Sequence, residues 1–409
     1  MSKLEELIRE LCPDGVEYKT LGELGKFFGG LTGKSKDDFK DGNEKFITYK
    51  NVYANPALQI DVEDKVKIAV GEKQRTLQYG DVVFTGSSET PDECGISSVV
   101  TVKTDEKLYL NSFCFFFRFN DLSIVLPDFA KHLFRSSNLR YQIGKTASGV
   151  TRYNVSKKLM ENVIIPLPPL PVQCEIVRIL DNFTELTAEL TAELTARQKQ
   201  YGYYQDLLLA RDGKEYALDE VCQIVDCPHT SPKWKETGIP VIRNYNLVNG
   251  IIDTSKLSYV DEEEYATRVK RIIPQENDIL FSREAPIGNV GIIPANFKCC
   301  QGQRVVLLRP NSQIVMPQFL IYVLQSEAVK EQINRVEKIG STVSNFNISD
   351  LKKLKFRIPP IEYQDEISKK LEAFSRICAD IFSGLPAEIT ARQKQYEYYR
   401  DKLLSFKER

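Results

Sequence analysis

The stretch TARQKQYGYYQDLLL, residues 195–209, returns 195 residues later as TARQKQYEYYRDKLL, residues 390–404. Twelve of the fifteen positions are identical, which indicates an internal duplication. A period near half of the 409 residues is typical of two domains rather than of a solenoid of short repeats. The sequence therefore predicts two related halves, each ending in the same polar, tyrosine-rich helix.

Composition sets limits on function. The formal net charge is −1, so the chain as a whole does not attract nucleic acid, and a DNA partner would need positive charge on one face or on other subunits. No apolar run approaches the roughly 18 residues of a membrane span. The first residues, MSKLEELIREL, form a charged amphipathic helix pattern without a signal-peptide core, so we expect a cytoplasmic protein.

Two regions have the pattern of mainly β domains. Between residues 20 and 165, and again between 215 and 357, short β-branched and aromatic runs alternate with Gly, Pro, Asn and Asp. Peripheral helices are expected at residues 126–139 and 316–336. The expected strands include residues 45–52, 81–85, 95–102 and 108–119, then 239–242, 278–282, 290–293 and 303–309.

A long helix is expected after each β region. Proline-rich exits at residues 166–171 and 358–361 cannot be helical, so the helices should begin at Gln173 and Gln364. Apolar positions along the first helix form a coiled-coil type of seam with a four-residue stutter, the tandem TAEL of residues 187–194. In the second helix, SGLP at residues 383–386 predicts a break or kink before a restart at Pro386.

These patterns predict an α+β fold with four segments. Residues 1–166 and 212–357 are the expected globular domains, and residues 167–211 and 358–409 carry the long helices. The N-terminal helix pattern precedes the first domain as the end of the first long helix precedes the second. We therefore expect the N-terminal helix to stand where a long-helix end stands in the other half.

The sequence shows no catalytic site. GGLTGKS at residues 29–35 looks like a phosphate-binding loop, but the required first glycine is replaced by Phe28. The two histidines lie beside no nucleophile pattern, so hydrolytic triad chemistry lacks its residues. Cys222, Cys227 and His229 lack the CxxC spacing of a structural zinc site. We predict no metal and no cofactor in this chain.

Binding residues are better represented. Cations suit phosphates, and amides and hydroxyls suit base edges; such residues recur at equivalent places in both halves. Single residues of these types also occupy ordinary solvated turns, but the duplicated placement favours a shared function. The predicted DNA contacts are Lys34, Lys36, Tyr49, Lys50, Asn51, Ser87, Arg152, Tyr153, Thr230, Lys233, Arg243, Asn244, Tyr245, Arg283 and Asn345. Tyr201, Tyr204, Tyr396 and Tyr399 are predicted to bind a partner, because amphipathic rings suit a protein interface, while another face of each helix packs internally.

Together these features resemble the DNA-specificity subunits of type I restriction-modification systems, and the TAEL tandem resembles one subgroup of them. The resemblance covers the whole chain and is carried by ARQKQY and the following YY near each helix end, the proline-rich exits and the TAEL repeat. It implies two target-recognition domains, each reading one half of a bipartite double-stranded DNA sequence. It also implies that the two spacer helices form an antiparallel coiled-coil pair with pseudo-twofold symmetry and set the gap.

The resemblance further implies partners. Two methyltransferase subunits would dock on the helices and supply the S-adenosylmethionine site, and motor and nuclease subunits would add restriction, with no role for a membrane. This chain would then be a non-catalytic specificity subunit. Two other interpretations stay open: a standalone nucleic-acid-binding regulatory protein, which would bind tightly when purified alone, and an enzyme with a cryptic site, which would need a cofactor motif that the sequence does not display.

Overall fold

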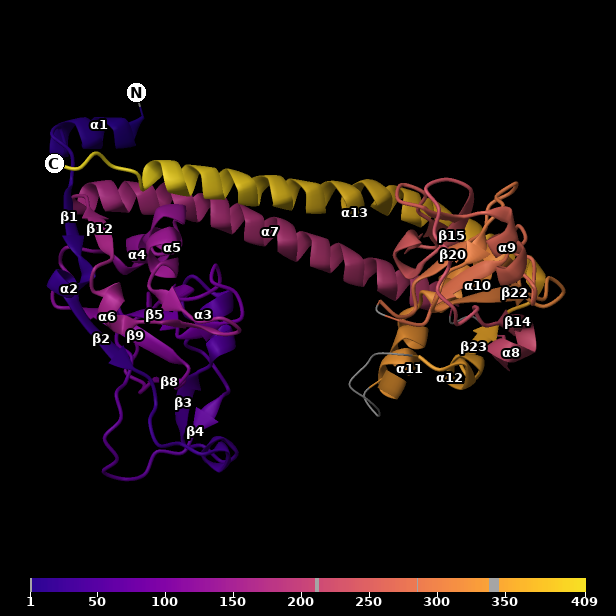
Figure 1. Cartoon of the computed structure of the whole chain (residues 1–409), viewed down its shortest axis with the longest axis horizontal. Coiled ribbons are helices and arrows are strands. Elements are labelled where there is room, and N and C mark those ends of the chain that lie inside the picture. The colour runs from indigo at the N-terminus through magenta and orange to yellow at the C-terminus, as the bar shows by residue number, and fades with distance from the viewer. Residues whose placement is uncertain (1, 210–212, 285, 338–345) are drawn as a thin grey trace. The chain divides into compact units, whose positions relative to one another are not determined.

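The computed structural model describes residues 2–209, 213–284, 286–337 and 346–409, with residues 377–383 described by their backbone alone. The chain divides into two compact units: unit 1 is Met1–Thr191 with Ala387–Arg409, and unit 2 is Ala192–Pro386. Each unit combines a strand-rich region with parts of two long helices, so the predicted α+β class is confirmed (Figure 1). No helix in the described part of the chain is both long and apolar enough to cross a membrane.

Unit 1 contains, outside the long helices, α1 (Lys3–Leu11), β1 (Glu17–Thr20), α2 (Leu21–Leu24), β2 (Gly25–Gly29), η1 (Lys36–Phe39), β3 (Glu44–Ile47), α3 (Tyr49–Ala54), β4 (Lys65–Val66), β5 (Val82–Thr85), β6 (Ser87–Ser88), β7 (Ser97–Val99), β8 (Tyr109–Leu110), β9 (Cys114–Phe119), α4 (Pro127–Leu133), α5 (Ser137–Gly144), β10 (Ala147–Ser148), β11 (Tyr153–Val155), α6 (Lys157–Met160) and β12 (Ile164–Leu167). Its largest sheet is antiparallel in the order β2-β9-β5-β7. Successive side chains of a strand point to opposite faces, so Phe115 and Phe117 join the core beside α4, whereas Phe116 joins a second core with Ile47 and Leu110. The sheet is therefore buried on both faces.

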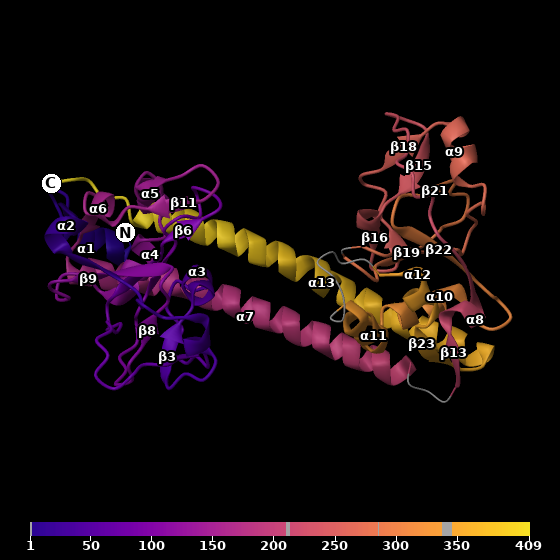
Figure 2. The same cartoon turned by 60° about the horizontal axis from the view of Figure 1, so that its bottom comes forward.

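Unit 2 contains β13 (Lys214–Ala217), α8 (Leu218–Val221), β14 (Cys222–Val225), β15 (Ile239–Ile242), η2 (Asn244–Asn246), β16 (Leu247–Val248), β17 (Ile251–Ile252), β18 (Ser258–Val260), α9 (Glu262–Arg268), β19 (Ile279–Ser282), β20 (Val290–Ile292), β21 (Cys300–Gln301), β22 (Val305–Pro310), α10 (Pro317–Leu324), α11 (Glu327–Glu337), α12 (Ile348–Lys352) and β23 (Lys355–Ile358). The sheet order β14-β22-β19-β20 repeats that of unit 1. A second sheet of the order β18-β15-β21 lies beside α9 (Figure 2). The parallel pair β15–β21 matches β3–β8, and the ladder β13–β23 matches β1–β12. Both units therefore share one topology, as the sequence repeat predicts.

Some predicted elements are wrong because polar caps divide them. Residues 45–52 do not form one strand: β3 ends at Ile47, and the Thr48 hydroxyl then accepts a hydrogen bond from the Asn51 amide at 3.3 Å and starts α3. The helices predicted at 126–139 and 316–336 are each two helices. Ser136 starts α5 and Ser326 caps α11 in the same way, each accepting a hydrogen bond from an amide three residues later.

The long helices are α7 (Leu170–Leu209) and α13 (Ile361–Leu403), and each begins three residues before the predicted glutamine. The two glutamines lock the helix starts with equivalent hydrogen bonds. Gln173 donates to the carbonyls of Ile124 and Pro168 at 2.8 Å and accepts from the Leu126 amide. Gln364 repeats all three hydrogen bonds in unit 2, so each strand-rich region is fastened to its helix by the same buried side chain.

Of the break or kink predicted at residues 383–386, the break is wrong, because α13 continues through Pro386, and the kink stays a prediction. A proline inside a helix removes one hydrogen bond and costs about 3 kcal/mol. The segments on either side are each held by packing: Ile367 and Leu371 lie in the core of unit 2, and Tyr396 and Leu403 pack against the core of unit 1. This packing outweighs the cost of one proline.

The N-terminal helix is an added element, not a counterpart of a long-helix end. In unit 1 the end of α13 takes the place that the end of α7 takes in unit 2, and α1 packs on top of it through Leu4, whose side chain is buried with Val172 and Leu404. The C-terminal tail then runs beside the first strand. The Val16 amide donates to the Lys407 carbonyl at 2.9 Å. Both termini therefore lie on unit 1 (Figure 1).

Candidate nucleic-acid interface

An open pocket of about 630 Å³ lies in unit 1 where β6, β11 and the start of α3 meet. The Tyr49 hydroxyl donates to the Ser87 carbonyl at 2.9 Å, and the Ser87 hydroxyl accepts from Arg152 Nε and Nη2 at 3.1 and 2.9 Å. These bonds fix an exposed guanidinium at the pocket wall. The lining residues are Tyr49, Lys50, Tyr53, Ser87, Ser88, Glu89, Glu93, Phe113, Thr151 and Arg152.

The pocket offers both hydrogen-bond donors and acceptors. Arg152 and Lys50 can donate to phosphates or to guanine, and the carboxylates of Glu89 and Glu93 can accept from a cytosine amino group. Glu93 already accepts from the Tyr53 hydroxyl at 2.7 Å, and this bond, its largest perturbation, lowers the pKa of the carboxyl below its usual value. Glu93 therefore stays ionised near neutral pH. Such a mixed surface fits base edges better than a purely basic groove would.

Six of the pocket residues are absent from the predicted contacts, and two of these, Ser88 and Thr151, directly adjoin the predicted Ser87 and Arg152. Tyr53 could have been found, because it lies one helical turn after Tyr49 and stacks on it with ring centroids 6.3 Å apart. Glu89, Glu93 and Phe113 carry no local signal, because the fold brings them to the pocket from separate loops.

In unit 2 Arg243 is an exposed cation that follows β15 directly. Its guanidinium lies 5.5 Å from the Trp234 ring centroid and 5.0 Å from the Tyr245 ring centroid. Both aromatic rings are exposed, and the Tyr245 hydroxyl lies 3.3 Å from the Ser258 hydroxyl. Two aromatic faces therefore hold a cation at the surface, an arrangement suited to phosphate or base contacts. Trp234, the only tryptophan of the chain, was not among the predicted contacts.

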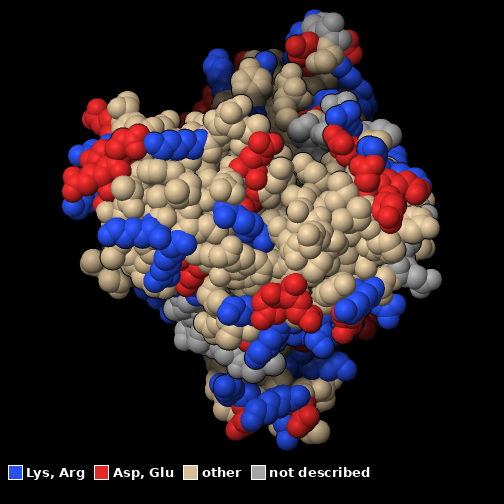
Figure 3. Space-filling view, turned by 90° about the vertical axis from the view of Figure 1, so that its right-hand side faces the viewer, with Lys and Arg blue, Asp and Glu red and all other residues tan. Residues whose placement is uncertain are grey.

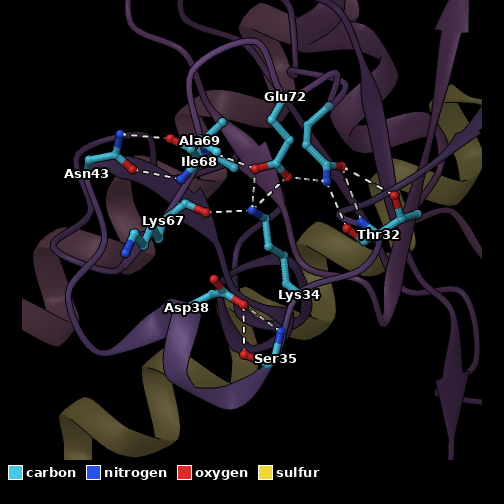
Figure 4. Close-up of polar contacts among 10 residues, drawn as sticks. Thr32, Lys34, Ser35, Asp38, Asn43, Lys67, Ile68, Ala69 and Glu72 are labelled. Atoms are coloured by element: carbon cyan, nitrogen blue, oxygen red, sulfur yellow. Dashed lines mark hydrogen bonds and ion pairs between the residues drawn. The ribbon is translucent and has the colours of Figure 1, made fainter.

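Three predicted contacts are engaged inside the protein. The Lys34 ammonium lies 2.6 Å from both a Glu72 carboxylate oxygen and the Lys67 carbonyl, and its side chain is only 9% exposed (Figure 4). Asn51 exchanges hydrogen bonds with the backbone of Gln59. The side chains of Lys34 and Asn51 therefore each hold a loop in place. The ammonium of Lys34, in the glycine-rich stretch, binds Glu72 and the Lys67 carbonyl rather than a phosphate.

Arg283 has the same kind of role in unit 2. It is buried, with Nη1 2.9 Å from Asp226 Oδ1 and Nε donating to the Phe346 carbonyl at 2.8 Å. Among the other predicted contacts, Tyr153 pairs in β11 opposite Ser88, and the Asn244 side chain accepts from the Tyr245 amide. Lys36, Thr230 and Lys233 are exposed, and Asn345 lies outside the described residues.

The tyrosines predicted to bind a partner pack mainly within their own unit. Tyr201 stacks on Phe374 with ring centroids 5.5 Å apart, and Tyr204 meets the same ring edge to face. In unit 1 the Tyr396 hydroxyl lies 2.9 Å from His132 Nδ1, and Tyr399 stacks on Phe183. The more exposed members of the repeated cluster are Tyr203 and Tyr398, which are 65% and 62% exposed.

Charge is mixed at the surface. The face in Figure 3, which looks onto unit 2, shows Lys and Arg interspersed with Asp and Glu among uncharged residues. On this face the described residues form no large basic region, in agreement with the net charge of −1. Within the described part of the chain no group of three metal ligands lies together, and burial raises the pKa of the Cys222 thiol to about 12, far from a thiolate ligand.

Comparison with known proteins assigns both halves of the chain to one kind of domain. The family model for the type I restriction modification DNA specificity domain matches twice, at residues 13–197 and 211–391. A Haemophilus influenzae protein provisionally named as a type I restriction enzyme specificity subunit is 31% identical over 278 residues, which are 63% of this chain and 68% of that protein.

Two further likenesses point the same way. The EcoR124I/EcoR124II type I restriction enzyme specificity subunit of Escherichia coli is 31% identical over 62% of this chain and 65% of its own length, just under two thirds. A solved structure from a study of complex assembly and conformational transition of the type I R-M system covers 96% of this chain and 98% of its own, with a TM-score of 0.60 at 19% identity. At that identity the likeness establishes the fold.

Proposed function

The chain belongs to the family of type I restriction modification DNA specificity domains, and from this premise we propose that it is the sequence-recognition subunit of a type I restriction-modification complex. The proposal rests on one observation: the family model of a DNA specificity domain matches this chain twice, and the two units have the same strand topology. Two copies of a reading domain in one chain suit a target with two separate parts. Its role in the complex is recognition and not catalysis.

We assign recognition to residues 1–166 and 212–357, each reading one half of a bipartite site. The pocket around Arg152 and Lys50 supports this for unit 1, and Arg243 between Trp234 and Tyr245 supports it for unit 2. Both places present a fixed cation beside groups that can contact base edges. We therefore assign DNA contact to those predicted side chains that lie at the surface.

We assign the gap between the half-sites to the helices of residues 167–211 and 358–409, as an antiparallel pair about a pseudo-twofold axis. Within unit 1 the end of α13 packs against the start of α7, and within unit 2 the start of α13 packs against the end of α7. Two methyltransferase subunits, which would bring S-adenosylmethionine, and motor and nuclease subunits complete the proposed complex. Partner subunits could also supply phosphate contacts that a chain of net charge −1 does not.

The experiment is methylation mapping. The purified chain, combined with a type I methyltransferase subunit from the same genome, should methylate a random-sequence DNA library at one bipartite motif with a fixed gap. The chain alone should bind that motif weakly. Tight and specific binding by the chain alone would favour the standalone regulatory protein instead, and a single uninterrupted motif would contradict two reading domains.

A further inference from the structure

The turn between β21 and β22 of unit 2, residues 302–304, matches the turn between β8 and β9 of unit 1, residues 111–113. The backbone fixes this register with two equivalent hydrogen bonds in each unit. The Asn111 and Gly302 amides donate to the carbonyls that end β3 and β15, at 2.9 and 2.8 Å. The Phe113 and Arg304 carbonyls accept from the amides that follow β5 and β19, at 2.8 and 2.9 Å. Arg304 therefore occupies the position of Phe113, which lines the unit 1 pocket.

The turn of residues 302–304 lies directly beside Arg243. A Cβ atom on Gly302 would come within 3.1 Å of Arg243 Cγ, so the turn packs against this side chain. Gln303 is exposed, and its Nε2 donates to the Ser231 hydroxyl at 3.3 Å, in the segment that precedes β15. Arg304 was not among the contacts predicted from sequence, although it neighbours a cation that we assign to DNA contact.

Arg304 has an unusual backbone conformation. Its φ is 66°, in the left-handed region, where a Cβ atom crowds the backbone. Among the described residues, the other non-glycine residues with a positive φ are three asparagines, a residue type that tolerates this conformation. The Arg304 amide donates to Cys227 Sγ at 3.1 Å, which helps to hold the conformation. The backbone thus favours glycine or asparagine here, and an arginine indicates a requirement for its side chain.

The Arg304 side chain is oriented by Glu284. Arg304 Nη1 lies 3.0 Å from Glu284 Oε1, and the two side chains are 44% and 32% exposed. An ion pair at this exposure contributes little to stability, so the fold alone does not account for it. Glu284 has the position of Ser87, since each lies two residues beyond its strand, β19 or β5. The Ser87 hydroxyl orients Arg152 in unit 1, so both units orient an arginine through the same position of the fold.

We propose that Arg304 and Glu284 read one G·C base pair in the half-site of unit 2, an inference that rests on the proposed function and adds one base pair to it. In the major groove, guanine presents two neighbouring acceptors, N7 and O6, and cytosine presents the N4 amino donor beside them. An arginine can donate to both guanine atoms, and a carboxylate can accept from the cytosine amino group. An A·T pair presents a donor between its two acceptors and does not match. A phosphate is a poor alternative ligand, because the adjacent carboxylate repels it.

Binding to modified DNA tests the contact. The unit 2 half-site is the one that changes when residues 217–355 are replaced, and 7-deazaguanine, which lacks only N7, replaces each of its guanines in turn. The purified complex of the full chain and the methyltransferase should lose affinity about tenfold at one position. The Arg304→Asn complex should bind the normal and the modified duplex equally at that position. The inference is overturned if this half-site has no G·C pair, or if the modification affects wild type and variant alike.

Methylation mapping of substitutions separates a base contact from a phosphate contact. Arg304→Asn should keep the melting temperature, because asparagine tolerates the positive φ, and should lose the G·C preference at one position of one half-site. Arg304→Lys keeps the charge but not the planar fork, and should lose the same preference. The control is Lys298→Ala, which breaks an exposed ion pair with Glu262 in the same unit and should leave the motif unchanged.

The outcomes distinguish the inference from the proposed function. An unchanged motif in both Arg304 variants would overturn the inference. Uniformly weaker binding to all sequences, with a smaller salt slope, would make Arg304 a phosphate contact and would overturn it as well. If the wild-type complex methylates no bipartite motif, the proposed function itself fails.

Discussion

At the scale of single residues, the structure separates cations that hold the fold from cations that can contact DNA. Lys34 and Arg283 are committed to the carboxylates of Glu72 and Asp226, which lie 38 and 57 residues away in the sequence. Arg152 and Arg243 are exposed and are oriented by a hydroxyl and by aromatic rings. All four were predicted from sequence as DNA contacts, because a lysine or arginine in a loop gives no local sign of a distant ion-pair partner.

Arg243→Ala should weaken recognition of one half-site without unfolding the chain. Loss of a base contact costs about 1–3 kcal/mol and relaxes the preference at one position, whereas loss of a phosphate contact weakens all sequences and reduces the salt slope by about one. Fluorescence of Trp234, the only tryptophan, reports binding at the same place. Arg283→Ala is the control, and it should lower the melting temperature. Unchanged affinity and unchanged specificity in Arg243→Ala would return Arg243 to the role of a solvated surface residue.

His132 should make unit 1 sensitive to mild acid. Its ring is buried between α4, α7 and α13, with Nε2 2.8 Å from Asp181 Oδ1 and Nδ1 2.9 Å from the Tyr396 hydroxyl. A neutral ring protonated on Nε2 satisfies both partners, since Asp181 accepts and Tyr396 can donate. Burial lowers the pKa of His132, despite the opposing effect of Asp181.

The sign of the pH effect follows from that shift. Because the folded pKa lies below that of the unfolded chain, the unfolded state takes up the proton first, and stability should fall as the pH drops below about 6.5. His132→Gln keeps one donor and one acceptor but cannot titrate. The melting temperature of the wild type should therefore fall more between pH 7.5 and pH 5.5 than that of the variant; parallel losses would show that another group is responsible.

At the scale of elements, the two long helices pass from one unit to the other at two unusual sequences. The passage in α7 falls within the TAEL tandem, between Thr191 and Ala192, and the passage in α13 falls at Pro386. Leu190 and Leu194 of the tandem and Leu186 just before it are half-buried, and most of the remaining residues of the tandem are exposed. In this segment only one side of the helix is partly buried. Its length can therefore change without disturbing either core.

Deleting residues 191–194 should shorten the unread gap by one base pair and leave both half-sites unchanged. Four residues change an α-helix by about 6 Å and roughly 40° of net rotation. One base pair advances about 3.4 Å and turns roughly 34 to 36°. The rotations match, and a helix inclined to the DNA axis projects less than its full length. Methylation mapping of the deletion is the measurement, and altered half-site bases with the original gap would contradict the prediction.

Local signals explain which elements could be predicted. The proline-rich exits and the glutamines behind them place the long helices to within three residues, because both act on the backbone nearby. The helix through Pro386 could not be predicted, because packing of distant residues keeps it continuous. The caps Thr48 and Ser136 could have been recognised as helix starts, but runs of apolar residues around them matched longer elements.

At the scale of the whole molecule, each strand-rich region is closed by one two-stranded ladder. Thr20 pairs with Ile164 in unit 1, and Ala217 pairs with Lys355 in unit 2. The chain therefore enters and leaves each region at neighbouring points, next to the long helices. The repeat and its topology could be predicted from sequence because the helix repeat is nearly identical, whereas the pocket could not, because it joins loops that share no pattern.

Replacing residues 20–165 with the corresponding region of another family member should therefore change one half-site and leave the other half-site and the gap unchanged. Both cut points lie at the β1–β12 ladder, so the graft needs no new path for the backbone. The donor must keep a buried partner for Asp181 and Tyr396 in place of His132, and a carbonyl for Gln173, because these contacts seat the region on its helices. Methylation mapping of the hybrid, beside one that replaces residues 217–355, reads out each half-site separately. A change in both halves of the motif from a single graft would contradict independent reading by the two units.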